Sequence, residues 1–380
     1  MIRNGSNIFF KAPRRIGRSS LIKHLFRQEE ILSGYNTMFI DIYGTKNMDE
    51  FINEFQGAFM DTPFAKTEVG KRKITELLRS IFLQVNTDFA GNLSGVGLGL
   101  REQNTISITL KEMFRFLENT SKPNLVVFDE FQVINDYPEK AAAILRTFIQ
   151  QMNNTQFIFS GSSRHLLDRM FEYPNEPFFR SAASLGLGPI GMEPYVEFCC
   201  ELFHLYGKSI EKEAIELVYQ LFSANTYDMQ EVMKETFPEI RPGDTAVTSD
   251  IRSAINRLLG SRDEEFRAIL DRISNEKNRR VLKCIAKEGI ASELTSGSMI
   301  KRYGLDTASS VQNALNVLMG NNLRLIVRAG EARYQLRDRF FELWLARRNN
   351  LLEGKFNSAP ERFSQESKMG YWASSSKPKS

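Results

Sequence analysis

Short apolar runs recur through the first half of the chain, and stretches with helical spacing separate them. The first run, residues 8–10, reads Ile-Phe-Phe, and a later run ends at the adjacent carboxylates Asp129 and Glu130. Runs of this length without polar alternation are typical of strands that are buried on both faces. The runs are residues 8–10, 37–41, 124–128 and 156–160, and a fifth strand is expected near residues 184–187. Strands that alternate with helices in this way predict an α/β fold with one parallel sheet and helices on both faces.

The second half of the chain shows mainly helical spacing. Residues 193–237 have this pattern throughout, and further helices are predicted over residues 249–259 and directly after Arg262. Three short helices and two strands then follow, at residues 279–287, 296–303, 307–319, 323–328 and 332–336. This order predicts a winged helix-turn-helix, and the apolar residues Phe340 and Trp344 mark one more helix after it.

The loop after the first apolar run has the frame of a phosphate-binding P-loop. Residues 12–19 read Ala-Pro-Arg-Arg-Ile-Gly-Arg-Ser, and helical spacing begins directly afterwards. A strand, a loop and a helix with Ala12, Gly17 and Ser19 at this spacing match that frame. In such a loop the backbone N–H groups point into one concavity at a helix N-terminus, where the helix dipole also favours an anion.

Arg18 occupies the position at which a P-loop normally carries lysine. Lysine is a compact point charge and arginine is a broad planar fork, so the exchange is not conservative. Arg18 can contact a β- or γ-phosphate only if the loop accommodates the larger head group. We therefore expect nucleotide binding to survive the exchange better than hydrolysis does. Ser19 keeps the hydroxyl that a Mg²⁺ ion requires.

Polar residues close two of the predicted strands. Asp129 and Glu130 follow the run at residues 124–128, and Ser160 closes the next one. Open α/β sheets bind ligands at the carboxyl ends of their strands, where Asp129 would hold Mg²⁺ through water and Glu130 would orient or deprotonate the attacking water. Ser160 stands where a γ-phosphate sensor would be. The alternatives are two solvated acids at a strand end and a small hydroxyl before a glycine turn.

The composition excludes two classes of protein. The chain has 380 residues, of which 42% are apolar and 25% charged, as in an ordinary globular protein with two or three domains. Its three cysteines, with Cys199 beside Cys200, cannot form a disulfide framework. No apolar stretch approaches the roughly 18 residues of a membrane helix, and no signal region opens the chain. We expect a soluble cytoplasmic protein without a membrane partner.

Together these motifs resemble a known family. The segments A-P-R-R-I-G-R-S-S-L, D-E-F-Q, F-S-G-S-S and P-F-F-R-S are similar to those of archaeal and bacterial AAA-type ATPases of the STAND-like MNS branch, near the Orc/Cdc6 group. The resemblance covers residues 7–348. It implies a P-loop NTPase (AAA/ASCE) parallel sheet with a helical lid and a C-terminal winged helix, and an ATP-binding molecular switch that uses Mg²⁺.

The resemblance also implies roles for individual residues. Ser19 and Asp129 would hold Mg²⁺, Glu130 would complete the acidic pair, and Ser160 would be the sensor. Arg180 matches a recurrent arginine that contacts the γ-phosphate or couples the core to the lid; its alternative is an ordinary surface arginine. The residues expected to wrap the triphosphate are Ala12, Pro13, Arg14, Arg15, Ile16, Gly17, Arg18, Ser19 and Ser20.

Two departures from the family pattern accompany Arg18. Six residues precede the first strand, whereas the relatives carry a helical segment that helps to hold adenine, so an incomplete adenine site is expected. In the lid, residues 224–230 lack the histidine and one aromatic residue of the relatives. ATP hydrolysis is therefore expected to be weak or impaired. The alternative is a pseudo-ATPase without turnover that acts as a DNA-binding or scaffold protein.

The patterns divide the chain into four segments. We expect a P-loop core over residues 1–192, a lid with connecting helices over 193–274, a winged helix over 275–350 and a disordered tail over 351–380. Within the core, the glycine-rich residues 86–108 predict an extended edge ribbon or a loop.

The winged helix carries an excess of positive charge. Residues 277–348 hold fourteen Lys and Arg against six Asp and Glu, a local net charge of +8, whereas the whole chain has +4. Such an excess suits duplex phosphates, with Arg328 or Arg333 on the wing and polar side chains on the predicted recognition helix. The latter are Thr307, Ser309, Ser310, Gln312 and Asn313. A winged helix can equally contact a protein, so both DNA and a protein partner stay open.

Overall fold

The computed structural model describes residues 2–12, 16–62, 64–91, 98–320 and 322–368. The chain forms two compact units, Met1–Leu187 and Gly188–Ser380. The first boundary therefore lies five residues before the one predicted at residue 192. In the part of the chain described, no helix combines the length and the hydrophobicity that are needed to cross a bilayer.

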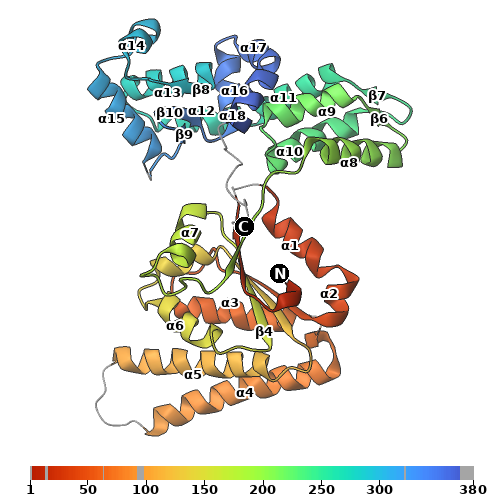
Figure 1. The fold of residues 1–380 in the computed structure, drawn as a ribbon, viewed down its shortest axis with the longest axis vertical. Helices are drawn as coiled ribbons and strands as arrows, with labels where there is room; N and C mark the ends of the chain where they lie inside the picture. Colours follow the sequence, from red (N-terminus) through yellow and green to blue (C-terminus); the bar gives the residue numbers. More distant parts are fainter. Residues whose placement is uncertain (1, 13–15, 63, 92–97, 321, 369–380) are drawn as a thin grey trace, which may run out of the picture. The chain divides into compact units, whose positions relative to one another are not determined.

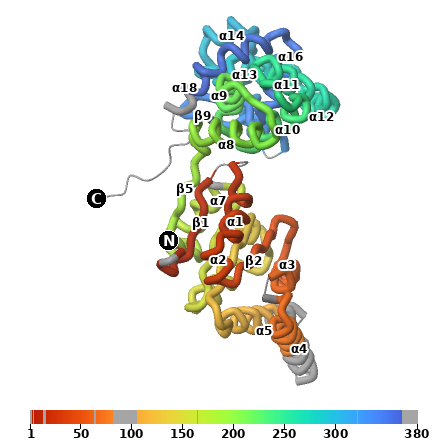
Figure 2. The backbone as a smooth tube through the Cα atoms, turned by 90° about the vertical axis from the view of Figure 1, so that its right-hand side faces the viewer, coloured from red at the N-terminus to blue at the C-terminus, as the bar shows by residue number. Residues whose placement is uncertain are grey.

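The first unit is built on a five-stranded sheet, which confirms the predicted α/β class. The strands are β1 (Ile8–Lys11), β2 (Asn36–Asp41), β3 (Asn124–Asp129), β4 (Thr155–Phe159) and β5 (Ala183–Gly186). They run parallel in the order β2-β3-β4-β1-β5, and Figure 2 shows the edge strand β5 beside β1. All five predicted strands are present. Since the strands are parallel, their carboxyl ends lie along one edge of the sheet.

Helices cover both faces of this sheet (Figure 1). Successive residues of a strand point to opposite faces, so Ile8 and Phe10 join one buried cluster and Phe9 joins the other. The smaller cluster lies under α1 (Arg18–Phe26) and α2 (Glu29–Gly34). The larger cluster lies under α3 (Met48–Asp61), α5 (Leu98–Glu118), α6 (Ala141–Ile149) and α7 (Arg164–Glu172). Burial on both sides explains why the sequences of the inner strands β1, β3 and β4 do not alternate.

A helical pair replaces the ribbon or loop that was predicted at residues 86–108. Helix α4 (Glu68–Gly91) extends into this region, and α5 begins at Leu98, so the prediction is wrong for the residues described on either side. The two helices lie side by side (Figure 1). The apolar residues Leu110 and Phe114 of α5 pack into the larger core. Burial of this helical face stabilises α5.

The second unit begins with helices. They are α8 (Met192–Leu205), α9 (Lys212–Leu221), α10 (Thr226–Thr236), α11 (Thr248–Ser261) and α12 (Asp263–Asp271). One short strand, β6 (Ser209–Ile210), interrupts the region that was predicted to be helical throughout and pairs with β7 (Thr245–Ala246).

The winged helix follows in the predicted order. Its elements are α13 (Glu276–Glu288), β8 (Ile290–Ser292), α14 (Gly297–Tyr303), α15 (Ala308–Met319), β9 (Ile326–Gly330), β10 (Arg333–Leu336) and α16 (Arg339–Arg348). The wing strands β9 and β10 pair antiparallel, and β8 joins β10 on its other side.

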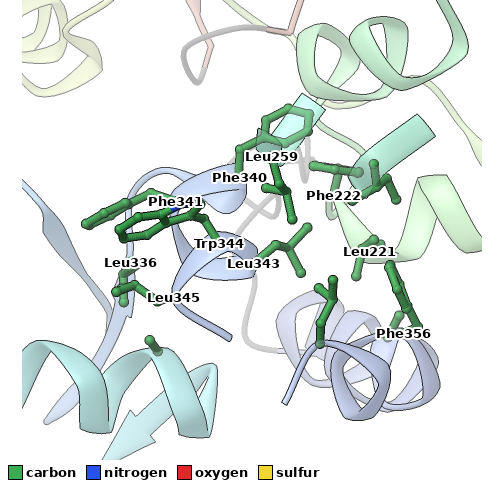
Figure 3. Close-up of a cluster of buried hydrophobic side chains, with 14 of the residues drawn as sticks. Leu221, Phe222, Leu259, Leu336, Phe340, Phe341, Leu343, Trp344, Leu345 and Phe356 are labelled. Atoms are coloured by element: carbon green, nitrogen blue, oxygen red, sulfur yellow. The ribbon is translucent and has the colours of Figure 1, made fainter. Parts of the chain in front are cut away.

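The predicted disordered tail is wrong over most of its length. Two further helices, α17 (Leu352–Asn357) and α18 (Ala359–Lys368), continue the fold, and only residues 369–380 lie outside the described residues. Phe356 and Ala359 are buried in the core that also contains residues of α8–α12 and the winged helix. Figure 3 shows Phe340 of α16 close to Phe222, and Trp344 beside Phe341, within this core. A single core explains why the predicted boundary at residue 275 falls inside one unit.

Candidate nucleotide-binding site

The predicted P-loop joins β1 to α1 at the carboxyl edge of the sheet. Gly17 has φ 86°, a left-handed conformation that favours glycine, and α1 begins at the next residue. Its N-cap residue, Gly17, makes no side-chain hydrogen bond to the helix. Ala12 and Ile16 are buried and anchor the two ends of the loop. Pro13, Arg14 and Arg15 lie outside the described residues.

Ser19 and Asp129 come together at this edge although 110 residues separate them. The Ser19 hydroxyl donates a hydrogen bond of 2.7 Å to Oδ2 of Asp129. Mg²⁺ binds oxygen at about 2.0–2.1 Å in octahedral geometry, so two neighbouring ligand oxygens lie about 2.9 Å apart. A hydroxyl and a carboxylate at this separation fit two adjacent positions around one Mg²⁺ ion.

Arg18 lies against the second carboxylate of the acidic pair. Its Nη2 is 3.8 Å from Oε1 of Glu130, and the side chain is only 8% exposed. The cation that replaces the usual lysine is therefore paired with the residue that is expected to orient water. Because both side chains are largely buried, solvent screens this attraction weakly.

Three further donors fix the Glu130 carboxylate. The backbone of Glu130 has φ 58°, which is uncommon for a residue other than glycine. Its Oε2 accepts hydrogen bonds from the Gln132 amide at 2.6 Å, the Ser162 hydroxyl at 2.7 Å and the Ser162 N–H at 3.1 Å. Burial acts to raise the pKa of Glu130, but these hydrogen bonds, with the Arg18 charge, hold it below its ordinary value.

Gln132 and Ser162 are the site residues that the sequence reasoning missed. Both belong to recognised segments, D-E-F-Q and F-S-G-S-S, and their polarity next to buried strands was the available signal. Gly161 has a steric role between them. A Cβ at this position would lie 1.9 Å from Oε1 of Gln132, so a larger residue would displace the amide that holds Glu130.

Ser160 follows β4, which lies between the P-loop strand β1 and the Asp129 strand β3. Its backbone N–H donates to Phe128 and its carbonyl accepts from Phe131. The side chain is fully buried, and its hydroxyl has no hydrogen-bond partner among the described residues. An unpaired buried hydroxyl is costly, so this is a position at which a ligand or a water would be stabilised. Ser20 is exposed on α1.

Arg180 is not brought to this edge. It precedes β5 by three residues, and β5 begins at Ala183, opposite Ile8 at the start of β1. Arg180 therefore lies toward the amino edge of the sheet, whereas the other site residues lie at the carboxyl edge. Its guanidinium is exposed and stacks on Phe179, with Cζ 4.9 Å from the ring centroid.

The parallel sheet, the loop before α1 and the acidic pair define the class of protein: the chain has the fold of a Walker-type, AAA-type ATPase with a C-terminal winged helix. Comparison with solved structures supports this fold. The Walker-type ATPase PABY2304 of Pyrococcus abyssi has a TM-score of 0.57 at 17% identity, over 90% of this chain and 92% of that one. The ORC2 protein of Aeropyrum pernix, in its ADPNP–ADP complexes, has a TM-score of 0.53 at 12% identity, over 93% and 88%.

Sequence comparison identifies one part of the chain. The family described as "Probable winged helix domain" matches residues 264–347, which confirms the predicted winged helix. None of the curated protein sequences matches the chain.

Proposed function

We propose that the chain binds ATP and Mg²⁺ at the β1–α1 loop and acts as a molecular switch of the AAA/STAND type with weak or impaired hydrolysis. The observation that carries this proposal is the 2.7 Å contact between Ser19 and Asp129 beside the N-terminus of α1. This contact supports the proposal because Ser19 and Asp129 would supply oxygen ligands for Mg²⁺ beside backbone N–H groups that would bind phosphate.

Each site residue has a role in this proposal. Ser19 and Asp129 would hold Mg²⁺, which would neutralise charge on the β- and γ-phosphates. The first turn of α1 would bind phosphate oxygens through its N–H groups. Glu130 would orient the attacking water, and Ser160 would contact the γ-phosphate. The unpaired hydroxyl of Ser160 supports the last role.

Two contacts of Glu130 favour slow turnover. Arg18 pairs with Oε1 and must leave this carboxylate before it can contact a phosphate. Oε2 already accepts three hydrogen bonds, and the lowered pKa makes the carboxylate a weaker base. Phosphoryl transfer depends on positioned positive charge and an oriented water. This arrangement opposes both until the Arg18–Glu130 pair opens.

The Arg18–Glu130 pair also favours a second candidate, a pseudo-ATPase that binds DNA or a protein through its winged helix without turnover. ATP binding without phosphate release is expected in that case. In both candidates the winged helix supplies the partner contact. The two candidates differ in whether bound nucleotide changes the conformation of the chain.

A thermal unfolding experiment tests the nucleotide site. Mg²⁺–ATP at about 100 times its Kd should stabilise the full-length chain by about 2.7 kcal/mol and raise its Tm. Ser19→Ala and Asp129→Asn should each reduce the rise, and a chelator should reduce it in the unmodified chain. Ser33→Ala on α2, an exposed serine distant in sequence from the loop, serves as the matched control. An unchanged Tm at millimolar Mg²⁺–ATP would contradict ATP binding.

A further inference from the structure

The predicted recognition helix of the winged helix carries no charge. The exposed positions of α15 include Ser309, Gln312, Asn313 and Asn316, and its sequence contains no Lys or Arg. Residues 277–348 nevertheless hold a net charge of +8. Affinity for nucleic acid derives largely from Lys and Arg contacts with phosphates. The charge that could supply these contacts therefore lies on other elements.

Much of it gathers in a groove between α13 and α16. Two cavities of about 400 and 360 Å³ adjoin there, and both are lined by Lys283, Leu345 and Asn349. Helix α12 closes one end, and Tyr303 with Leu351 closes the other. The basic residues that line the groove are Arg267, Arg279, Arg280, Lys283, Lys287 and Arg348. One acid, Asp271, lines it as well.

Most of these cations lack a carboxylate partner. Within the residues described, Arg280, Lys283, Lys287 and Arg348 form no ion pair with an acid; Lys287 and Arg348 instead lie over aromatic rings. Arg279 is 3.9 Å from Asp271, a loose pair. Arg267 is paired with Asp263 at 2.6 Å, as Arg302 on α14, outside the groove, is paired with Glu288 at 3.4 Å. The groove therefore keeps an uncompensated positive charge at the surface.

We propose that the groove between α13 and α16 binds the phosphodiester backbone of a nucleic-acid strand. Arg280, Lys283 and Lys287 recur along α13 at about 4.5 and 6 Å of helix rise, which presents a row of cations to a row of anions. The guanidinium and ammonium groups donate hydrogen bonds to phosphate oxygens, and the exposed Asn349 amide, which already donates to the Leu345 carbonyl, has a second N–H for the same purpose. In this arrangement α15 contributes uncharged hydrogen-bonding groups, and the groove contributes the affinity.

This site is separate from the nucleotide site and uses none of its residues. A strand can bind the groove whether or not ATP binds the β1–α1 loop. The two proposals therefore fail independently, and binding of nucleic acid is measured first in the absence of ATP.

Fluorescence anisotropy with the full-length chain tests the groove, using a labelled 20-nucleotide single strand and the matching duplex at low salt. We expect Lys283→Glu to weaken binding of at least one of them about tenfold or more. Each lost phosphate contact should also reduce the slope of log K against log salt by about 0.7–0.9. Lys301→Glu, the same charge change at an exposed site on α14 outside the groove, should weaken binding less than threefold.

Further variants make the result decisive. The paired change Arg280→Gln with Lys283→Gln repeats the test without charge reversal, and an unchanged Tm shows that each variant is folded. Equal losses from Lys283→Glu and Lys301→Glu, or a loss confined to Gln312→Ala and Arg328→Glu on α15 and the wing, would overturn the proposal. The proposal would also be overturned if neither the single strand nor the duplex binds at low salt while a labelled polyglutamate does. The groove would then bind an acidic protein.

Discussion

At the residue scale, Arg18 and Glu130 restrain each other. The guanidinium lies 3.8 Å from a carboxylate that three hydrogen bonds already hold in place. A lysine at this position would have one compact ammonium group and a stem that turns more freely. The identity of a single side chain thus decides whether positive charge is directed at a phosphate or at the carboxylate.

Arg18→Lys should therefore raise ATP hydrolysis. We expect phosphate release to increase at least about tenfold, since a positioned positive charge on the transferred phosphate is worth more than this in comparable sites. Steady-state phosphate release measures the effect, and Arg18→Ala is the control that removes the cation altogether. Turnover that stays the same in Arg18→Lys would show that Arg18 does not limit the reaction.

Glu130 should make stability depend on pH below its ordinary pKa of about 4.5. Because its pKa is lowered on folding, its contribution is fully present above pH 4.5 and is lost as the pH falls through the folded pKa. The difference in unfolding free energy between the unmodified chain and Glu130→Gln should be constant from pH 7 to 5 and shrink below 4.5.

Urea unfolding at a series of pH values measures this difference. Ser162→Ala removes a donor from Glu130 and should move the loss to higher pH, because fewer hydrogen bonds then favour the charged carboxylate. If this difference in unfolding free energy does not vary between pH 7 and 3, the pKa of Glu130 is not lowered by folding.

At the scale of the element, α16 connects the winged helix to the C-terminal helices. Glu342 on this helix has no exposed surface, and three cations surround its carboxylate. Arg339 lies 2.6 Å away and Lys355 of α17 lies 3.0 Å away, while Arg362 of α18 also pairs with it. One buried charge thus fixes α17 and α18 to α16.

Glu342→Gln should destabilise the chain by about 3–5 kcal/mol, because loss of the carboxylate leaves buried cations without a counter-charge. Equilibrium unfolding in urea at pH 7 measures this. Glu331→Gln at the exposed wing tip is the matched control, with an expected effect within about 0.5 kcal/mol. If Glu342→Gln costs less than 1 kcal/mol, the three cations are solvated and the cluster does not fix these helices.

The same elements show the limit of composition as a guide. The composition predicts a disordered tail because the chain is rich in Ser, Lys and Pro from about Lys355 onward. Leu352, Phe356 and Ala359, however, recur at i, i+4 and i+7 and are buried. This short apolar stripe is stabilised by contacts with α9, which lies more than a hundred residues earlier in the sequence, and with α16, which lies only a few residues earlier. Propensity within the segment could not reveal those partners.

At the scale of the whole molecule, the switch proposal makes a claim about the connection between the two units. Residues 186–191 form this connection and are half-buried or exposed. If ATP biases the arrangement of core, lid and winged helix, the environment of this segment must differ between the two states. The pseudo-ATPase alternative requires no such difference.

Hydrogen exchange with mass spectrometry distinguishes these outcomes. Mg²⁺–ATP should slow exchange around residues 16–22 and 129–132, because it binds there, and should alter exchange in the peptide that contains residues 186–191. Ser19→Ala, with reduced affinity for Mg²⁺–ATP, should show smaller changes in both regions. Protection of the first two regions with an unchanged connection would favour nucleotide binding without switching.

The sequence by itself determined the strands, the winged helix and the positions of the candidate motifs. These features are local: apolar runs, helical spacing and turn residues are determined within about ten to twenty neighbouring residues. The tertiary structure decided the features that join distant residues. Strand order placed Ser160 between the P-loop and Asp129 and put Arg180 toward the opposite edge. Tertiary packing also brings Glu130 next to Arg18 and directs Gln132 and Ser162 at the same carboxylate. It buries residues of the predicted tail as well. Each of these contacts depends on a surface that only the folded chain brings together.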